Sequence, residues 1–85
     1  MFSVDARVIM KSFNGTRITP ASCDPRENYW LLIGERGTVV EPQNDKGRVL
    51  VRFDTSVVRK GLHCHNPTPN SLYILTSDLD ILPQT

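Results

Sequence analysis

Two short strand patterns joined by a polar turn, in residues 33–54, constrain the fold of this chain more than any other feature. In residues 48–54, Arg-Val-Leu-Val-Arg-Phe-Asp, valine and phenylalanine at alternate positions give the period of two that is typical of a strand with one buried face. Residues 38–40, Thr-Val-Val, are β-branched and favour an extended backbone. Residues 44–47, Asn-Asp-Lys-Gly, have the side chains and the glycine that tight turns use. The pattern predicts a β-hairpin at the centre of the fold.

The length and the charge of the chain limit what it can be. Its 85 residues suit one domain, residues 1–85, and 39% of them are apolar. A domain of this size buries only about 60–65% of its unfolded surface, so we expect a thin core. Ten basic and nine acidic residues give a formal net charge of +1. This balance lacks the strong positive charge that is typical of a nucleic-acid-binding domain.

The first residues and the cysteines indicate a compartment. Residues 1–7 carry charges where a signal peptide needs an apolar run, and no apolar run in the chain is long enough to span a membrane. The two cysteines, Cys23 and Cys64, are too few for a disulfide framework. We therefore expect a cytoplasmic protein of bacterial type, with reduced thiols and no membrane partner.

Most of the chain outside the hairpin reads as short strands and loops. Residues 11–28 form a long first loop, in which Asp24-Pro25-Arg26-Glu27 matches the start of a helix, with Asp as the cap. Residues 29–33, Tyr-Trp-Leu-Leu-Ile, are then either a helix that Gly34 ends or an apolar strand, and we favour the strand. The six strands expected in the chain cover residues 4–10, 37–42, 48–54, 60–65, 71–75 and 79–82.

The central residues resemble a known fold family. Residues 34–39, Gly-Glu-Arg-Gly-Thr-Val, followed by residues 49–54, Val-Leu-Val-Arg-Phe-Asp, resemble the core hairpin of small bacterial SH3-like barrels of the KOW type. Residues 77–82, Ser-Asp-Leu-Asp-Ile-Leu, are similar to the turn and last strand that finish such barrels. The resemblance implies an all-β fold, a small SH3-like barrel of five to six short antiparallel strands with a long first loop. The aromatic residues with which such domains bind proline-rich ligands are not arranged in that way here, and the fold alone implies no ligand.

Aromatic and arginine residues in and beside the first loop favour a protein-binding role. Phe13 is expected to be exposed and to act as an apolar anchor, with Arg17 and Arg26 as hydrogen-bond donors and Tyr29 beside them. Trp30 is expected to be mostly buried in the barrel. We therefore predict a small non-catalytic binding or accessory module whose partner is another protein.

Nucleic acid is the alternative partner. Arg48 and Arg52 share the outward face of one predicted strand, and Arg36 and Lys46 lie near them in the sequence. A KOW-like barrel with these residues on one face would contact the phosphates of RNA or DNA.

The triplet His63-Cys64-His65 is the remaining candidate for chemistry. On a strand its two imidazoles would share one face, while Cys64 would join Leu62 in the core. Zinc sites use three or four protein ligands, and no second ligand pair is present in the sequence. The same alternation separates the thiol from both imidazoles, so it gives no nucleophile and base. We predict no catalysis, no cofactor and no metal, and His63 and His65 are the weak candidates for metal ligands.

Overall fold

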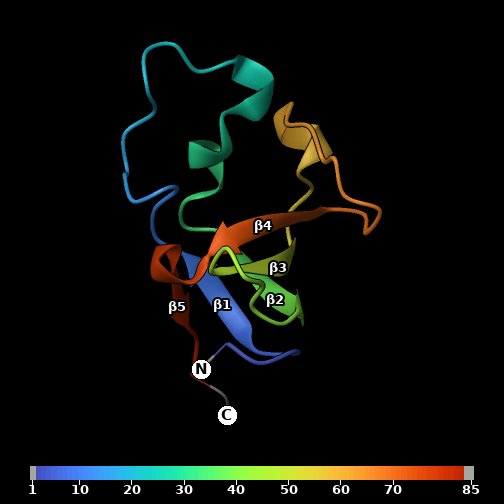
Figure 1. Ribbon diagram of the computed structural model, residues 1–85. Helices are drawn as coiled ribbons and strands as arrows, with labels where there is room; N and C mark the ends of the chain where they lie inside the picture. The colour runs from blue at the N-terminus through green and yellow to red at the C-terminus, as the bar shows by residue number, and fades with distance from the viewer. Residues whose placement is uncertain (1, 84–85) are drawn as a thin grey trace.

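A single five-stranded antiparallel sheet organises the computed structural model, which describes residues 2–83 (Figure 1). The strand order is β4-β3-β2-β1-β5, so β4 and β5 are the two edges of an open sheet. Four short 3₁₀ turns, η1 to η4, are the helical elements of the described residues. The strands are β1 (Arg7–Met10), β2 (Arg36–Glu41), β3 (Arg48–Phe53), β4 (Ser71–Leu75) and β5 (Leu79–Ile81). The 3₁₀ turns are η1 (Pro25–Glu27), η2 (Tyr29–Leu32), η3 (Val58–Lys60) and η4 (Thr76–Asp78).

The predicted central hairpin is confirmed as β2 and β3. The two strands pair with Val39 opposite Val51, and the register shifts at a bulge between Val39 and Glu41. In the turn, the side chain of Asn44 accepts hydrogen bonds from the backbone N–H groups of Lys46 and Arg48, both at 3.0 Å. Residues 44–47 therefore form the tight turn that their sequence predicts.

The middle of β3 is buried on both faces of the sheet. Val51 is fully buried in the core, and Leu50, on the opposite face, is also only 1% exposed. Leu50 pairs with Glu41 on one side and with Tyr73 on the other. The hydroxyl of Tyr73 donates to the Glu41 carboxylate at 3.0 Å, so these two side chains close over Leu50.

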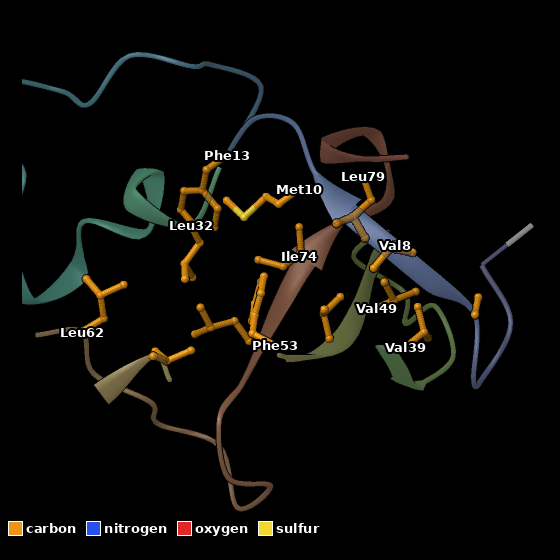
Figure 2. Close-up of a cluster of buried hydrophobic side chains, with 14 residues drawn as sticks. Val8, Met10, Phe13, Leu32, Val39, Val49, Phe53, Leu62, Ile74 and Leu79 are labelled. Atoms are coloured by element: carbon orange, nitrogen blue, oxygen red, sulfur yellow. The ribbon is translucent and has the colours of Figure 1, made fainter. Parts of the chain in front are cut away.

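The hydrophobic core extends from the sheet into the loops. Figure 2 shows Phe13, Leu32 and Leu62 continuing the cluster that Phe53 and Ile74 form on the sheet. In Figure 1 the first loop and the segment that carries η3 lie together on one side of the strands. Side chains from the loops therefore complete the hydrophobic core that the strands begin.

Two predicted strands are wrong. Residues 29–33 form η2 instead, because Asp24 caps η1 by accepting from the Arg26 N–H, and η2 follows at once. Residues 60–65 have no strand partner, because η3 ends in the left-handed Gly61 and the His63 N–H donates to the carbonyl of Arg26 in the first loop. The remaining predicted strands agree with β1 to β5, although β1 begins three residues later than expected.

Gly37 gives a prediction about the fold. A Cβ added at this buried position in β2 would lie 2.6 Å from the Arg52 carbonyl oxygen and 2.7 Å from a methyl group of Val51. We expect Gly37→Ala to lower the free energy of unfolding by about 2–3 kcal/mol, because the backbone of β3 must move. Urea denaturation followed by circular dichroism measures this change.

Gly34→Ala is the matched control. Its added methyl group meets nothing within 4 Å, and only the positive φ of +92° opposes alanine. That conformation costs about 1 kcal/mol. Equal losses in the two variants would contradict the close approach of β2 and β3 at Gly37.

Candidate functional site

A buried carboxylate fixes the tip of the first loop. Asp78, in η4, is fully buried and accepts three hydrogen bonds from the loop. The donors are the Ser12 hydroxyl at 2.6 Å, the Asn14 N–H at 2.8 Å and the Gly15 N–H at 3.0 Å. Asn14 and Gly15 both have positive φ, and the backbones of the residues on either side of them pair with each other. The tip is therefore a two-residue hairpin turn held against the end of the sheet.

This turn directs Phe13 into the core. Phe13 is 9% exposed, so the expectation that it projects into solvent is wrong. Its ring meets Trp30 edge to face, with centroids 4.9 Å apart, and lies 5.6 Å from the ring of Tyr29. Trp30 packs against the core with most of its surface buried, as expected. Its indole Nε1 is buried and has no hydrogen-bond acceptor within residues 2–83.

The same three aromatic residues line a pocket of about 420 Å³ on the first loop. We call it the aromatic pocket; Phe13, Tyr29 and Trp30 line it together with Asp24 and Glu27. Of the described residues, no lysine, arginine or histidine is part of this lining. Hydrogen bonds from the backbone and then the side chain of Arg26 lower the pKa of Asp24. The lining therefore combines aromatic rings with negative charge.

Smaller side chains complete the wall of the aromatic pocket. Exposed Ser22 and partly exposed Cys23 belong to it, and the Cys23 thiol donates to the backbone carbonyl of Asp24 at 3.3 Å. Both cysteines of the chain are free thiols. Cys64 lies instead against the core and donates to the carbonyl of Ser71 at 3.2 Å.

Residues 63–65, which we call the histidine segment, contact the aromatic pocket through Tyr29. The Tyr29 hydroxyl donates to the His63 carbonyl at 2.8 Å. Burial, and then the charge of Glu27, raise the pKa of Tyr29. The rings of His63 and His65 are exposed and 5.2 Å apart. Among the residues that the structure describes, no group of three or more His, Cys, Asp and Glu side chains is placed to hold a metal ion.

Of the four residues expected to contact a protein partner, three lie in or beside the aromatic pocket and one does not. Phe13 and Tyr29 line the aromatic pocket, and Arg26 stands beside it, with its guanidinium 3.4 Å from the Asp24 carboxylate. Arg17 is exposed elsewhere on the first loop. Sequence reasoning did not predict Asp24 or Glu27 as residues of a pocket. The signal available in the sequence was the position of Asp24 and Glu27 a few residues before the aromatic pair at 29–30.

The basic residues considered for nucleic acid do not form one group. Arg48 is tied down, because its guanidinium donates to the side chain of Asn14 at 2.8 Å and to the carbonyl of Tyr73 at 3.1 Å. Lys46 lies in the turn between β2 and β3. The arrangement leaves Arg36 and Arg52 as the exposed pair on the strands.

Arg36 and Arg52 both lie close enough to the carboxylate of Asp54 to interact with its charge. Asp54 accepts from the Arg7 guanidinium at 2.8 Å, and this hydrogen bond lowers the pKa of Asp54. Arg36 and Arg52 also lower it by their charge. The three arginines Arg7, Arg36 and Arg52 therefore exceed the one carboxylate near them, Asp54, by two charges.

Comparison with protein-family models, curated proteins and solved structures found no match to this chain. Within residues 2–83, no helix has both the length and the hydropathy that crossing a membrane requires.

Proposed function

We propose that this protein is a non-catalytic binding module that receives a segment of a partner protein in the aromatic pocket. The observation that carries the proposal is the aromatic pocket itself, about 420 Å³ in volume and lined by Phe13, Tyr29 and Trp30. Pockets that take ligands in proteins have volumes of about 300–1,000 Å³ and a mostly apolar lining with a few polar groups. Aromatic side chains are also the usual anchors of protein interfaces.

The anchoring of the loop supports binding. Asp78 fixes the turn at Asn14 and Gly15, and Tyr29 is tied to the histidine segment through the His63 carbonyl. A loop that is already ordered loses little conformational entropy when a ligand binds, so more of the contact energy remains as affinity. Recognition by loops on a rigid sheet is common in small domains.

We further propose that the fold is the SH3-like barrel that the sequence resembles. The strand order β4-β3-β2-β1-β5 and the single 3₁₀ turn η4 between β4 and β5 support this assignment. The long loop between β1 and β2, which carries the aromatic pocket, agrees with the predicted long first loop. The fold indicates where a ligand binds, whereas the residues of the pocket determine which ligand binds.

A peptide selection tests the protein-binding proposal. A displayed library of random peptides is selected on the wild-type protein, and the enriched peptides are measured against Ser22→Phe and Ser77→Phe. Ser22 lines the aromatic pocket, and Ser77 is another exposed serine, in η4. We expect Ser22→Phe to weaken binding by about tenfold or more, because the new ring occupies the pocket. Ser77→Phe should bind as the wild type does.

Two results would contradict the proposal. One is a selection that enriches no peptide, and the other is a set of peptides that bind Ser22→Phe and wild type equally. Circular dichroism of both variants establishes that each is folded before binding is compared.

Nucleic acid stays the second candidate, and the exposed pair Arg36 and Arg52 is the observation in its favour. Binding of a labelled single-stranded RNA that the double variant Arg36→Gln, Arg52→Gln abolishes, and that Ser22→Phe leaves unchanged, would support this alternative. Such binding would also fall steeply with added salt.

A further inference from the structure

We infer that the aromatic pocket selects a cationic side chain, lysine or arginine, of the partner polypeptide. This inference rests on the proposed function, since it names the chemistry of the group that the pocket receives. It comes from the combination of three aromatic rings with two carboxylates in one lining that has no basic residue.

The charges at the pocket favour a cation. Asp24 and Glu27 both line it, and Glu27 makes no ion pair within the described residues. Two guanidinium groups outside the lining contact it: Arg26 lies 3.4 Å from the Asp24 carboxylate, and Arg48 donates to the Asn14 side chain at 2.8 Å. The charged side chains of the lining itself are both acidic, and within residues 2–83 the Glu27 carboxylate is the one left without an ion pair. Because the hydrogen bonds from Arg26 lower the pKa of Asp24, this carboxylate keeps its charge at any pH near neutrality.

The aromatic rings favour the same kind of ligand. Ammonium and guanidinium groups are attracted to the negative faces of Trp, Tyr and Phe within about 6 Å, by about 0.5–2 kcal/mol depending on desolvation. The aliphatic part of a lysine or arginine side chain can cover the apolar wall while its charged end meets Glu27. A neutral apolar side chain would gain only the contact with the apolar wall, without the attraction of a positive charge to the rings and to Glu27. An acidic side chain would be repelled by both carboxylates.

The volume of the aromatic pocket, about 420 Å³, leaves room for a lysine or arginine side chain. The aromatic pocket is open to solvent, and Pro20 and Ser22 of the first loop belong to its wall. The exposed arginines of the sheet, Arg36 and Arg52, are not part of it. A partner that reaches both places at once would need basic residues for the pocket and acidic residues for the sheet.

Trp30 is the sole tryptophan of the chain, so its fluorescence reports on the pocket directly. The probes are the N-acetyl methylamides of lysine, arginine, norleucine and glutamate, titrated into the intact protein. We expect lysine and arginine to give saturable changes, and norleucine to bind about three- to fivefold more weakly, since it lacks the charge. Glutamate should give no saturable change.

Two variants assign the effect to the pocket. Glu27→Gln removes the carboxylate that has no ion pair and should weaken lysine binding by about three- to fivefold or more. Asp45→Asn makes the same change of charge in the turn between β2 and β3, far from the pocket in the sequence, and should leave binding unchanged. Norleucine binding should be equal in all three proteins, because a neutral side chain does not depend on Glu27.

The inference is overturned if lysine and arginine give no saturable change, if norleucine binds as tightly as lysine, or if Glu27→Gln binds lysine as the wild type does. These failures differ from a failure of the proposed function. Selected peptides that lack basic residues, but still lose binding in Ser22→Phe, would retain the pocket and reject the cation. Selected peptides that bind Ser22→Phe normally would reject the pocket itself.

Discussion

Phe13→Ala is expected to lower the free energy of unfolding by about 3 kcal/mol or more. The Phe13 ring is 9% exposed and packs edge to face on Trp30, so its removal leaves a cavity where the first loop meets the core. For a domain of this size, that loss is a large share of the total stability, which is typically about 5–15 kcal/mol. Urea denaturation followed by circular dichroism measures the change without depending on the environment of Trp30.

Ile18→Ala is the matched control for Phe13→Ala. Ile18 is a large apolar residue of the same loop, but 78% of it is exposed. Its truncation should change stability by no more than about 0.5 kcal/mol. If the two variants lose equal stability, Phe13 does not belong to the core.

Asp78→Ala is the second change with a large expected effect, about 3 kcal/mol of unfolding free energy. The substitution leaves the Ser12 hydroxyl and the Asn14 and Gly15 N–H groups without their acceptor. Each buried donor left without a partner costs about 1–3 kcal/mol. The total for the three donors is smaller than their sum, because water reaches the released turn and accepts some of these hydrogen bonds. Chemical denaturation gives the total loss.

Asp80→Ala is the control, since Asp80 is an exposed aspartate that pairs with Lys11 at 3.0 Å. Exposed ion pairs contribute about 0–1 kcal/mol, so this variant should stay close to the wild type. Amide hydrogen exchange adds a local reading. The Asn14 and Gly15 amides should be protected in the wild type, and their exchange as fast as that of a free loop would contradict the role of Asp78.

The hairpin was predictable because its signals are local. Alternation in residues 48–54 sets which side chains face the core, and Asn44 and Gly47 set the turn, all within one stretch of sequence. The burial of Leu50 was not predictable, because it depends on Glu41 and Tyr73 meeting across β3. Local pattern gives the strands, whereas contacts between strands decide which outward residues are covered.

The place of Phe13 could not be read from its neighbours. It lies in a stretch rich in Ser, Asn, Gly and Thr, a composition that is typical of an exposed loop. A carboxylate 65 positions later, Asp78, holds the turn that points the ring inward. A hydrogen bond between residues so far apart leaves no mark on local composition.

The two wrong strands have a related cause. Residues 29–33 and 60–65 are short apolar or alternating runs, which period alone does not assign to helix or strand. The cap at Asp24 begins the 3₁₀ turns at residues 25–32, and the left-handed Gly61 ends η3 before residues 62–65. The cap was visible in the sequence as an alternative, but the pairing of the His63 N–H with the Arg26 carbonyl was not.

The candidate site was predictable only as a region. The sequence indicated the first loop and named Phe13, Tyr29 and Arg26, which the structure places in or beside the aromatic pocket. It did not indicate that the rings meet Glu27 around one cavity, because that arrangement depends on η1 and η2 turning the chain back toward Phe13.

We propose that ligands bind at the aromatic pocket of the anchored first loop. An NMR titration of ¹⁵N-labelled protein with a selected peptide tests it most directly, since the sole tryptophan gives one indole N–H signal. We expect the Trp30 indole signal and the amides of residues 22–24 and 26–29 to shift together with a single affinity, while the amides of Arg36 and Arg52 stay in place. Shifts confined to Arg36, Arg52 and their strand neighbours, with an unchanged Trp30 indole, would contradict the claim.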